Sequence, residues 1–134
     1  MKPYALAALA TLGLAACNDL AMMMPATAAA PVSTAPAVPI ATRAAAEPYL
    51  GRTLQAGNGS IVISADGTFA GQFGPNAVAG VWEFRDGFWC RTLTAGPPAA
   101  MAMRSDCQVW EVAGQEVRFT TQEGAGNTTS YVLG

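Results

Sequence analysis

The C-terminal part of the chain is a series of short runs in which apolar and polar residues alternate. The segment 80–91 shows this best, because Trp82 and Phe84 are separated and flanked by single smaller or charged residues, at the two-residue period of a β-strand. Asp86-Gly87 then supplies a two-residue turn signal, and extended chain resumes at Phe88. We therefore expect a β-hairpin whose aromatic rings dominate a small core.

Glycine-containing turns divide the rest of this region into strand-length pieces, at the spacing typical of β-sandwiches and β-barrels. Strands are predicted over residues 51–55, 60–64, 68–73, 79–85, 88–93, 106–112, 115–121 and 128–133. Most connections are short, so neighbouring strands should pair in an all-β antiparallel up-and-down meander. It can close as a barrel of about eight strands or fold over as a small sandwich. We expect the barrel, because closure leaves no free edge strand, and we predict no helix.

The residues 1–16 have the pattern of an export signal, with one charge at Lys2 and an apolar run too short to span a membrane. The following tetrapeptide, Leu-Ala-Ala-Cys at 14–17, resembles the lipobox of bacterial lipoproteins. This resemblance implies cleavage before Cys17 and lipidation of its sulfur, and two or more acyl chains hold a protein stably on a bilayer. Asn18 resembles the sorting pattern of outer-membrane lipoproteins, which implies the periplasmic face of that membrane.

Between residues 17 and 46 the composition changes to Ala, Pro, Thr and Met, without apolar periodicity. Prolines favour extended chain and interrupt helices. We therefore interpret 17–46 as a lipidated cysteine followed by a semi-rigid tether, and 47–134 as one small domain.

The cysteines predict a disulfide in this domain. A core of this size is marginally stable by itself, so a covalent cross-link is expected. The chain has three cysteines, and if Cys17 carries lipid, Cys90 and Cys107 remain as an even pair in an oxidising compartment. We predict that these two are bonded.

Charge and residue types exclude several functions. The domain is mildly acidic and contains no lysine, which argues against a nucleic-acid partner. The chain has no histidine, the commonest general base and metal ligand. Asp66 and Asp86 each precede glycine, which fits turn geometry better than a catalytic carboxylate pair. The glycine-rich segments 57–59 and 124–126 lack the third glycine of a dinucleotide fingerprint. We expect no enzymatic activity, no cofactor and no metal site.

The aromatic residues fit either a buried core or a stacking surface for a ligand. Trp89 and Arg91 share one face of their strand, and Cys90 lies on the other. We expect most rings in the core. As the candidate binding surface we name Trp89 with Arg91, and Trp110.

A spaced set of turn, aromatic and cysteine residues covers nearly the whole domain: Gly80, Trp82, Asp86, Gly87, Cys90, Arg91, Asp106, Cys107, Gln108, Gly114, Val117, Phe119, Gly124 and Gly126. This pattern resembles a group of small exported alphaproteobacterial proteins of unassigned function. Some members are labelled dihydrodipicolinate reductase. That enzyme resembles a Rossmann protein of far greater length with a nucleotide-binding glycine loop, which is absent from this sequence, so the sequence contradicts the label. A second likeness, of fold alone, is to periplasmic β-barrel peptidase inhibitors, which have an eight-stranded body with a tryptophan and one disulfide.

Two functional hypotheses follow from different classes. The first is a membrane-anchored periplasmic lipoprotein whose barrel is a binding or inhibitor-like module for a periplasmic protein or a small ligand. The second is a structural envelope lipoprotein without a dedicated ligand. Capture of a stoichiometric partner would distinguish them.

Overall fold

The computed structural model describes residues 33–134. The export signal, Cys17, Asn18 and the first part of the tether lie outside the described residues. The strands are β1 (Val38–Pro39), β2 (Thr53–Ala56), β3 (Gly59–Ile63), β4 (Thr68–Phe73), β5 (Asn76–Arg85), β6 (Phe88–Ala95), β7 (Ser105–Ala113), β8 (Glu116–Thr120) and β9 (Thr128–Leu133). The helices are α1 (Arg43–Ala46) and α2 (Pro98–Ala102), with 3₁₀ turns η1 (Glu47–Tyr49) and η2 (Gln122–Gly124).

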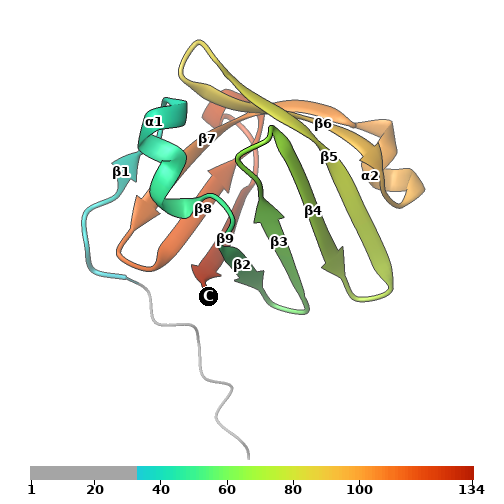
Figure 1. Ribbon diagram of the computed structural model, residues 1–134, viewed down its shortest axis with the longest axis horizontal. Helices are drawn as coiled ribbons and strands as arrows, with labels where there is room; N and C mark the ends of the chain where they lie inside the picture. The colour runs from blue at the N-terminus through green and yellow to red at the C-terminus, as the bar shows by residue number, and fades with distance from the viewer. Residues whose placement is uncertain (1–32) are drawn as a thin grey trace, which may run out of the picture. The chain divides into compact units, whose positions relative to one another are not determined.

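The strands form a closed antiparallel barrel (Figure 1). Strands β2 to β9 pair in sequence order, and β9 pairs with β2 at Leu54 and Leu133, which closes the ring. The expected all-β fold, its eight-stranded meander and its closure are therefore confirmed. Each predicted strand is present, with bounds that differ by at most a few residues.

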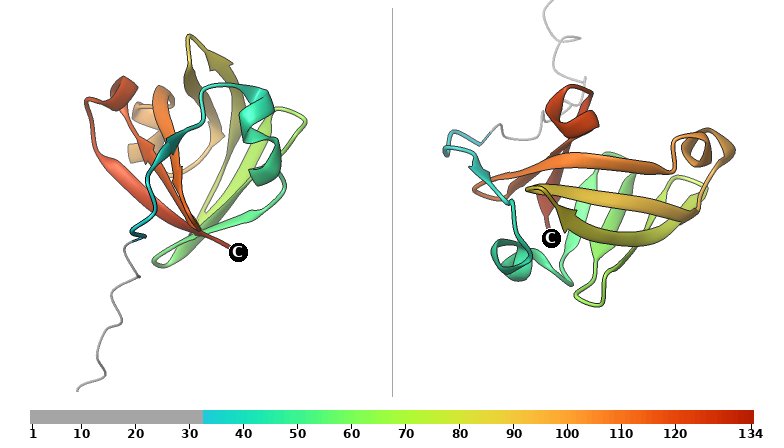
Figure 2. Two further views of the ribbon diagram at one scale, coloured as in Figure 1. Left: turned by 90° about the vertical axis from the view of Figure 1, so that its left-hand side faces the viewer. Right: turned by 90° about the horizontal axis from the view of Figure 1, so that it is seen from above.

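The meander gives the barrel two different ends, which we name by their helices. The α1 end holds the turns β3–β4, β5–β6 and β7–β8 together with α1 and η1. The α2 end holds the connections β2–β3, β4–β5, β6–β7 and β8–β9, with α2 in the third and η2 in the fourth. Figure 2 shows the strands curving around a common interior, with the two helices apart from each other.

The predicted hairpin forms between β5 and β6. Asp86 and Gly87 both have positive φ, 52° and 85°, as the tight turn requires. Strand β5 also shifts register between Ala79 and Gly80. A Cβ at Gly80 would lie 2.5 Å from the Phe69 ring, so only glycine allows the ring to pack against this part of the strand.

The tether boundary at residue 46 is a correction, because the folded unit begins earlier. Strand β1 pairs with β7, and the Ile40 amide donates to the Trp110 carbonyl at 2.8 Å. Ile40 and Ala46 are buried in the core. The prolines permit this, since Pro39 lies in a two-residue edge strand.

The two short helices correct the expectation of no helix. Helix α1 begins after Thr42, whose hydroxyl accepts from the Ala45 amide in an N-cap. Helix α2 has Pro98 at its first position, where a missing amide hydrogen costs nothing. Both are too short to produce a clear apolar periodicity in the sequence.

Aromatic rings in mostly tilted and edge-to-face contact fill the barrel from the α1 end to its middle. Trp110 lies within about 6 Å, between ring centroids, of four other rings: Tyr49, Phe84, Trp89 and Phe119. Trp82, beside Phe84, is covered by the Arg43 guanidinium at 5.1 Å and donates its indole N–H to the Ser64 and Thr68 carbonyls. The expected aromatic core is confirmed.

Candidate functional site

The inward-facing positions of β6 to β9 change character along the barrel. The inward positions nearer the α1 end carry large aromatic rings. The next inward position on each strand, two residues closer to the α2 end, carries a polar side chain. The pairs are Trp89 and Arg91, Trp110 and Gln108, Phe119 and Thr121, and Tyr131 and Thr129. The ring packing therefore stops part of the way along the interior.

A cavity of about 170 Å³ begins where the rings end. Its lining comes from seven strands or strand ends and from α2: Ile61, Phe69, Phe73, Val78, Trp89, Arg91, Leu93, Ala100, Gln108, Phe119, Thr121, Thr129 and Tyr131. Thr129 is an exposed residue, so the cavity reaches solvent at the α2 end.

The two walls of this cavity differ chemically. The wall from β3 to β5 is apolar, with Ile61, Phe69, Phe73 and Val78, and Leu93 and Ala100 continue it. The opposite wall, from β6 to β9, carries the polar groups described above. Such a lining suits a molecule with an apolar body and a polar end.

Among residues 33–134, Arg91 is the only charged residue in the lining. It is half-buried, and within residues 33–134 its guanidinium makes no ion pair or hydrogen bond. Burial raises the pKa of the Tyr131 phenol above its usual value, while the positive charge of Arg91 acts in the opposite direction. Arg91 and Tyr131 both line the cavity.

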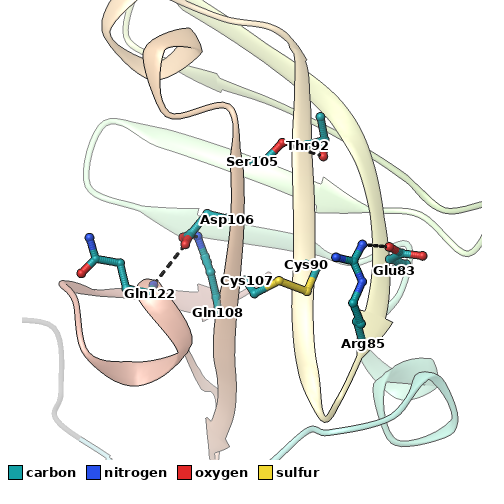
Figure 3. The surroundings of a disulfide bond; sticks show 9 residues. All are labelled: Glu83, Arg85, Cys90, Thr92, Ser105, Asp106, Cys107, Gln108 and Gln122. Carbon is teal, nitrogen blue, oxygen red and sulfur yellow. Dashed lines mark hydrogen bonds and ion pairs between the residues drawn. A yellow bond between two sulfur atoms is a disulfide. The ribbon is translucent and has the colours of Figure 1, made fainter.

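Gln108 is 4 % exposed. Its side chain is held by Asp106, and Asp106 lies opposite Arg91 in the sheet. Its side-chain nitrogen donates to Asp106 Oδ2 at 2.8 Å, and the backbone N–H of Gln122 donates to Oδ1 at 3.1 Å (Figure 3). Both oxygens of this carboxylate are thus engaged by the protein. Because the nitrogen of Gln108 faces Asp106, its carbonyl oxygen is left for other partners.

The loop that leads into β9 borders the same end and is held in an uncommon conformation. Gln122 and Glu123 both have positive φ, 53° and 54°, which costs about 1–3 kcal/mol each for residues other than glycine. The Gln122–Asp106 hydrogen bond and a pair of bonds between Thr121 and Asn127 maintain this shape. Several hydrogen bonds therefore fix the loop that borders the cavity beside Thr121.

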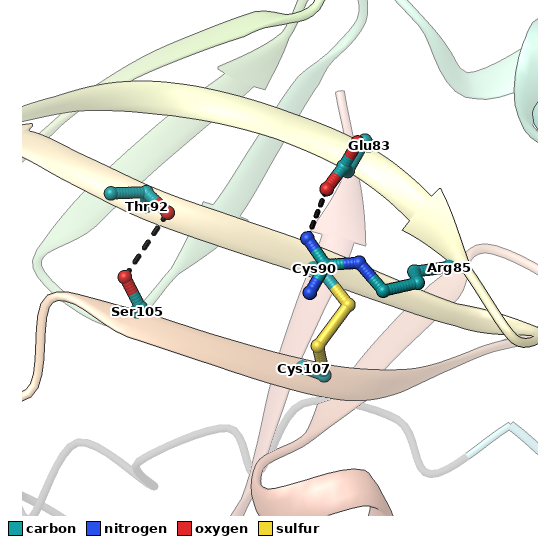
Figure 4. A network of polar contacts seen from close by, with 6 residues as sticks. All are labelled: Glu83, Arg85, Cys90, Thr92, Ser105 and Cys107. Atoms are coloured by element: carbon teal, nitrogen blue, oxygen red, sulfur yellow. Dashed lines mark hydrogen bonds and ion pairs between the residues drawn. A yellow bond between two sulfur atoms is a disulfide. The ribbon is translucent and has the colours of Figure 1, made fainter.

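The outer face of β6 and β7 carries the disulfide. Cys90 and Cys107 are directly opposite each other in the sheet and are joined with an S–S distance of 2.04 Å, which confirms the predicted bond. The ion pair of Glu83 and Arg85 lies beside it, and Thr92 meets Ser105 at 3.1 Å (Figure 4). This face is polar and is separated from the cavity by the sheet.

The structure separates the three residues of the predicted binding surface. Trp89 and Arg91 both line the cavity, so they lie together, but on the inner face of the barrel. Trp110 is 1 % exposed, is enclosed by other rings and does not line the cavity, so it belongs to the core instead. Four other lining residues were not predicted as part of a site: Gln108, Thr121, Thr129 and Tyr131. Continuing the two-residue alternation from the buried rings would have indicated them.

Within residues 33–134, no group of three or more acidic, cysteine or histidine side chains is arranged to hold a metal ion. No helix in this part of the chain has the length and apolar character needed to cross a bilayer. Comparison with protein-family models, with curated proteins and with solved structures gives no match.

Proposed function

We propose that this chain is a lipid-anchored envelope protein whose barrel binds a small, largely apolar molecule. The observation that carries the binding role is the cavity, because it interrupts an interior that is otherwise filled by rings. Protein interiors are normally close-packed, and an apolar cavity of about 150 Å³ is known to bind benzene. A space of about 170 Å³ fits a molecule of that size, and it is below the range of about 300–1,000 Å³ typical of sites for drug-sized ligands.

The envelope location rests on the lipobox resemblance. The Leu-Ala-Ala-Cys tetrapeptide at 14–17 supports cleavage and acylation at Cys17, and a periplasmic position agrees with the disulfide. In cell fractionation, Cys17→Ser should leave an unprocessed or soluble chain. A membrane-bound variant of wild-type mature mass would refute the anchor.

The binding role can be tested by filling the cavity. Val78→Phe places a ring into the space, and Val81→Phe adds the same ring to the exposed face of the same strand. Benzyl alcohol should show saturable ligand-observed NMR signals with wild type and Val81→Phe, but not with Val78→Phe.

Circular dichroism must show that both variants keep the wild-type fold. If wild type gives no saturable signal, or if Val78→Phe binds as well as wild type, the cavity is not a binding site. The hypothesis of a structural lipoprotein without a ligand would then be favoured.

A further inference from the structure

The two walls of the cavity define the chemical class of the ligand, given the binding role proposed above. We propose that the cavity binds a small amphiphile, with an apolar body no larger than about one six-membered ring and an anionic head group, such as a carboxylate, on Arg91 and Tyr131. The apolar body would lie against the wall formed by β3 to β5.

The position of Arg91 argues for the anionic head. A partly buried charge without a partner is unfavourable, and an anion that enters the site would supply that partner. The guanidinium presents several donors in a planar fork that fits a carboxylate. Arg91 makes no ion pair within residues 33–134, so its charge is available to a ligand.

Within residues 33–134 the nearby acidic groups form no ion pair with Arg91, although the negative charge of Asp106 remains beside it. Asp106 lies opposite Arg91, but both of its oxygens accept hydrogen bonds, from the Gln108 side chain and from the backbone N–H of Gln122. Glu123 is exposed on the strained loop. An anion beside Arg91 would therefore not need to displace an existing ion pair.

Two neutral groups complete the polar wall. The Tyr131 hydroxyl makes no hydrogen bond with another described residue and can donate to a carboxylate oxygen. The free carbonyl oxygen of Gln108 can accept from a hydroxyl or amide on the ligand or from a bridging water. Trp89 and Phe119 form the aromatic floor against which a ring can pack.

The test uses three probes that separate body from head. Phenylacetate has both, phenylacetamide has the same body with a neutral head, and acetate has the head alone. The mature protein in lipid nanodiscs would be titrated calorimetrically with each at pH 7, with empty nanodiscs as the blank. We expect phenylacetate to bind at least about tenfold more tightly than phenylacetamide, because a hydrogen bond to a charged group contributes more than a neutral one. Acetate should bind most weakly.

Arg91→Gln should lower phenylacetate affinity by a larger factor than it lowers phenylacetamide affinity, so that the two probes bind about equally. Arg91→Lys keeps the charge and should retain part of the preference. Arg104→Gln is the matched control, since Arg104 is exposed and does not line the cavity, and it should change nothing.

The outcomes distinguish the two proposals. If phenylacetamide binds as tightly as phenylacetate, the cavity remains a binding site and the anionic head is refuted. The same conclusion follows if Arg91→Gln and Arg91→Lys both keep the full preference for phenylacetate. If neither aromatic probe binds, the binding role itself fails. If acetate binds as tightly as phenylacetate, the apolar cavity is not involved, and both proposals are wrong.

Discussion

The two ends of this barrel share the same strands but use their interior differently. At the α1 end, Ile40 and Ala46 belong to the buried core, and Trp110 lies beside four other aromatic rings. At the α2 end the strands continue, but the interior side chains become polar and leave a cavity. The comparison indicates that close packing and open space are divided along the barrel axis. The α1 end supplies most of the buried ring area, and the binding role that we propose falls to the α2 end.

The largest expected effect concerns the packed end. Trp110→Ala should destabilise the protein by about 4 kcal/mol, because it removes a fully enclosed ring and leaves a large void. Trp89→Ala should cost about 1 kcal/mol less, since its void joins a cavity that already reaches solvent. Urea unfolding of both variants measures the difference. Equal losses, or a greater loss for Trp89→Ala, would contradict the division between the ends.

Next in size is the disulfide, which joins β6 to β7 on the outer face. The sequence separation of Cys90 and Cys107 is 17, and closing a loop of that size stabilises a fold by about 3 kcal/mol through constraint of the unfolded chain. Denaturant unfolding with and without reductant measures this. The double variant Cys90→Ala with Cys107→Ala should be as unstable as the reduced protein and should not respond to reductant. An unchanged midpoint after reduction would count against the expected contribution.

A smaller effect is expected from an apolar substitution at the α2 end. Gln108→Leu should change the free energy of unfolding by less than about 1 kcal/mol, since leucine adds apolar contacts as one hydrogen bond to Asp106 is lost. The reverse type of change in the packed part of the core, Leu54→Gln, should cost several times more, because an amide would be buried there without a partner. Parallel urea titrations test the pair. Similar costs for both would show that the two regions do not differ in their demand for apolar packing.

The smallest expected effect lies on the outer surface near the α1 end. Hydrogen bonds from Arg118 and then Ser130 lower the pKa of Glu116 from 4.5 to about 2. A lowered pKa in the folded state adds stability above the unfolded value, and this contribution is lost as the pH falls from about 4.5 through 2. Glu116→Gln should therefore lose less stability over that interval than wild type. Arg118→Gln should give the same flatter profile, and a slope equal to wild type in both would refute the linkage.

The strands were predictable because their signals are local. Alternation in 80–91, the Asp86-Gly87 turn and the spacing of glycines each depend on neighbouring residues, and the structure reproduces them. The Cys90–Cys107 bond was also predictable, from cysteine parity. The segment 33–46 was misassigned because its burial depends on β7, a distant part of the chain that no local pattern reveals.

The sequence by itself determined the order of strands β2 to β9, the alternation of side chains in the β5–β6 hairpin and the disulfide, because a two-residue period and short connections leave few alternatives. The tertiary structure alone decided which inward residues become core and which border a cavity. Trp89 and Trp110 have the same residue type and the same inward orientation, yet only Trp89 borders empty space. That difference depends on what the other strands and helices place opposite each ring. At the α1 end Tyr49 and Phe84 cover Trp110, whereas at the α2 end the partners beyond Trp89 are too small or too polar to fill the interior.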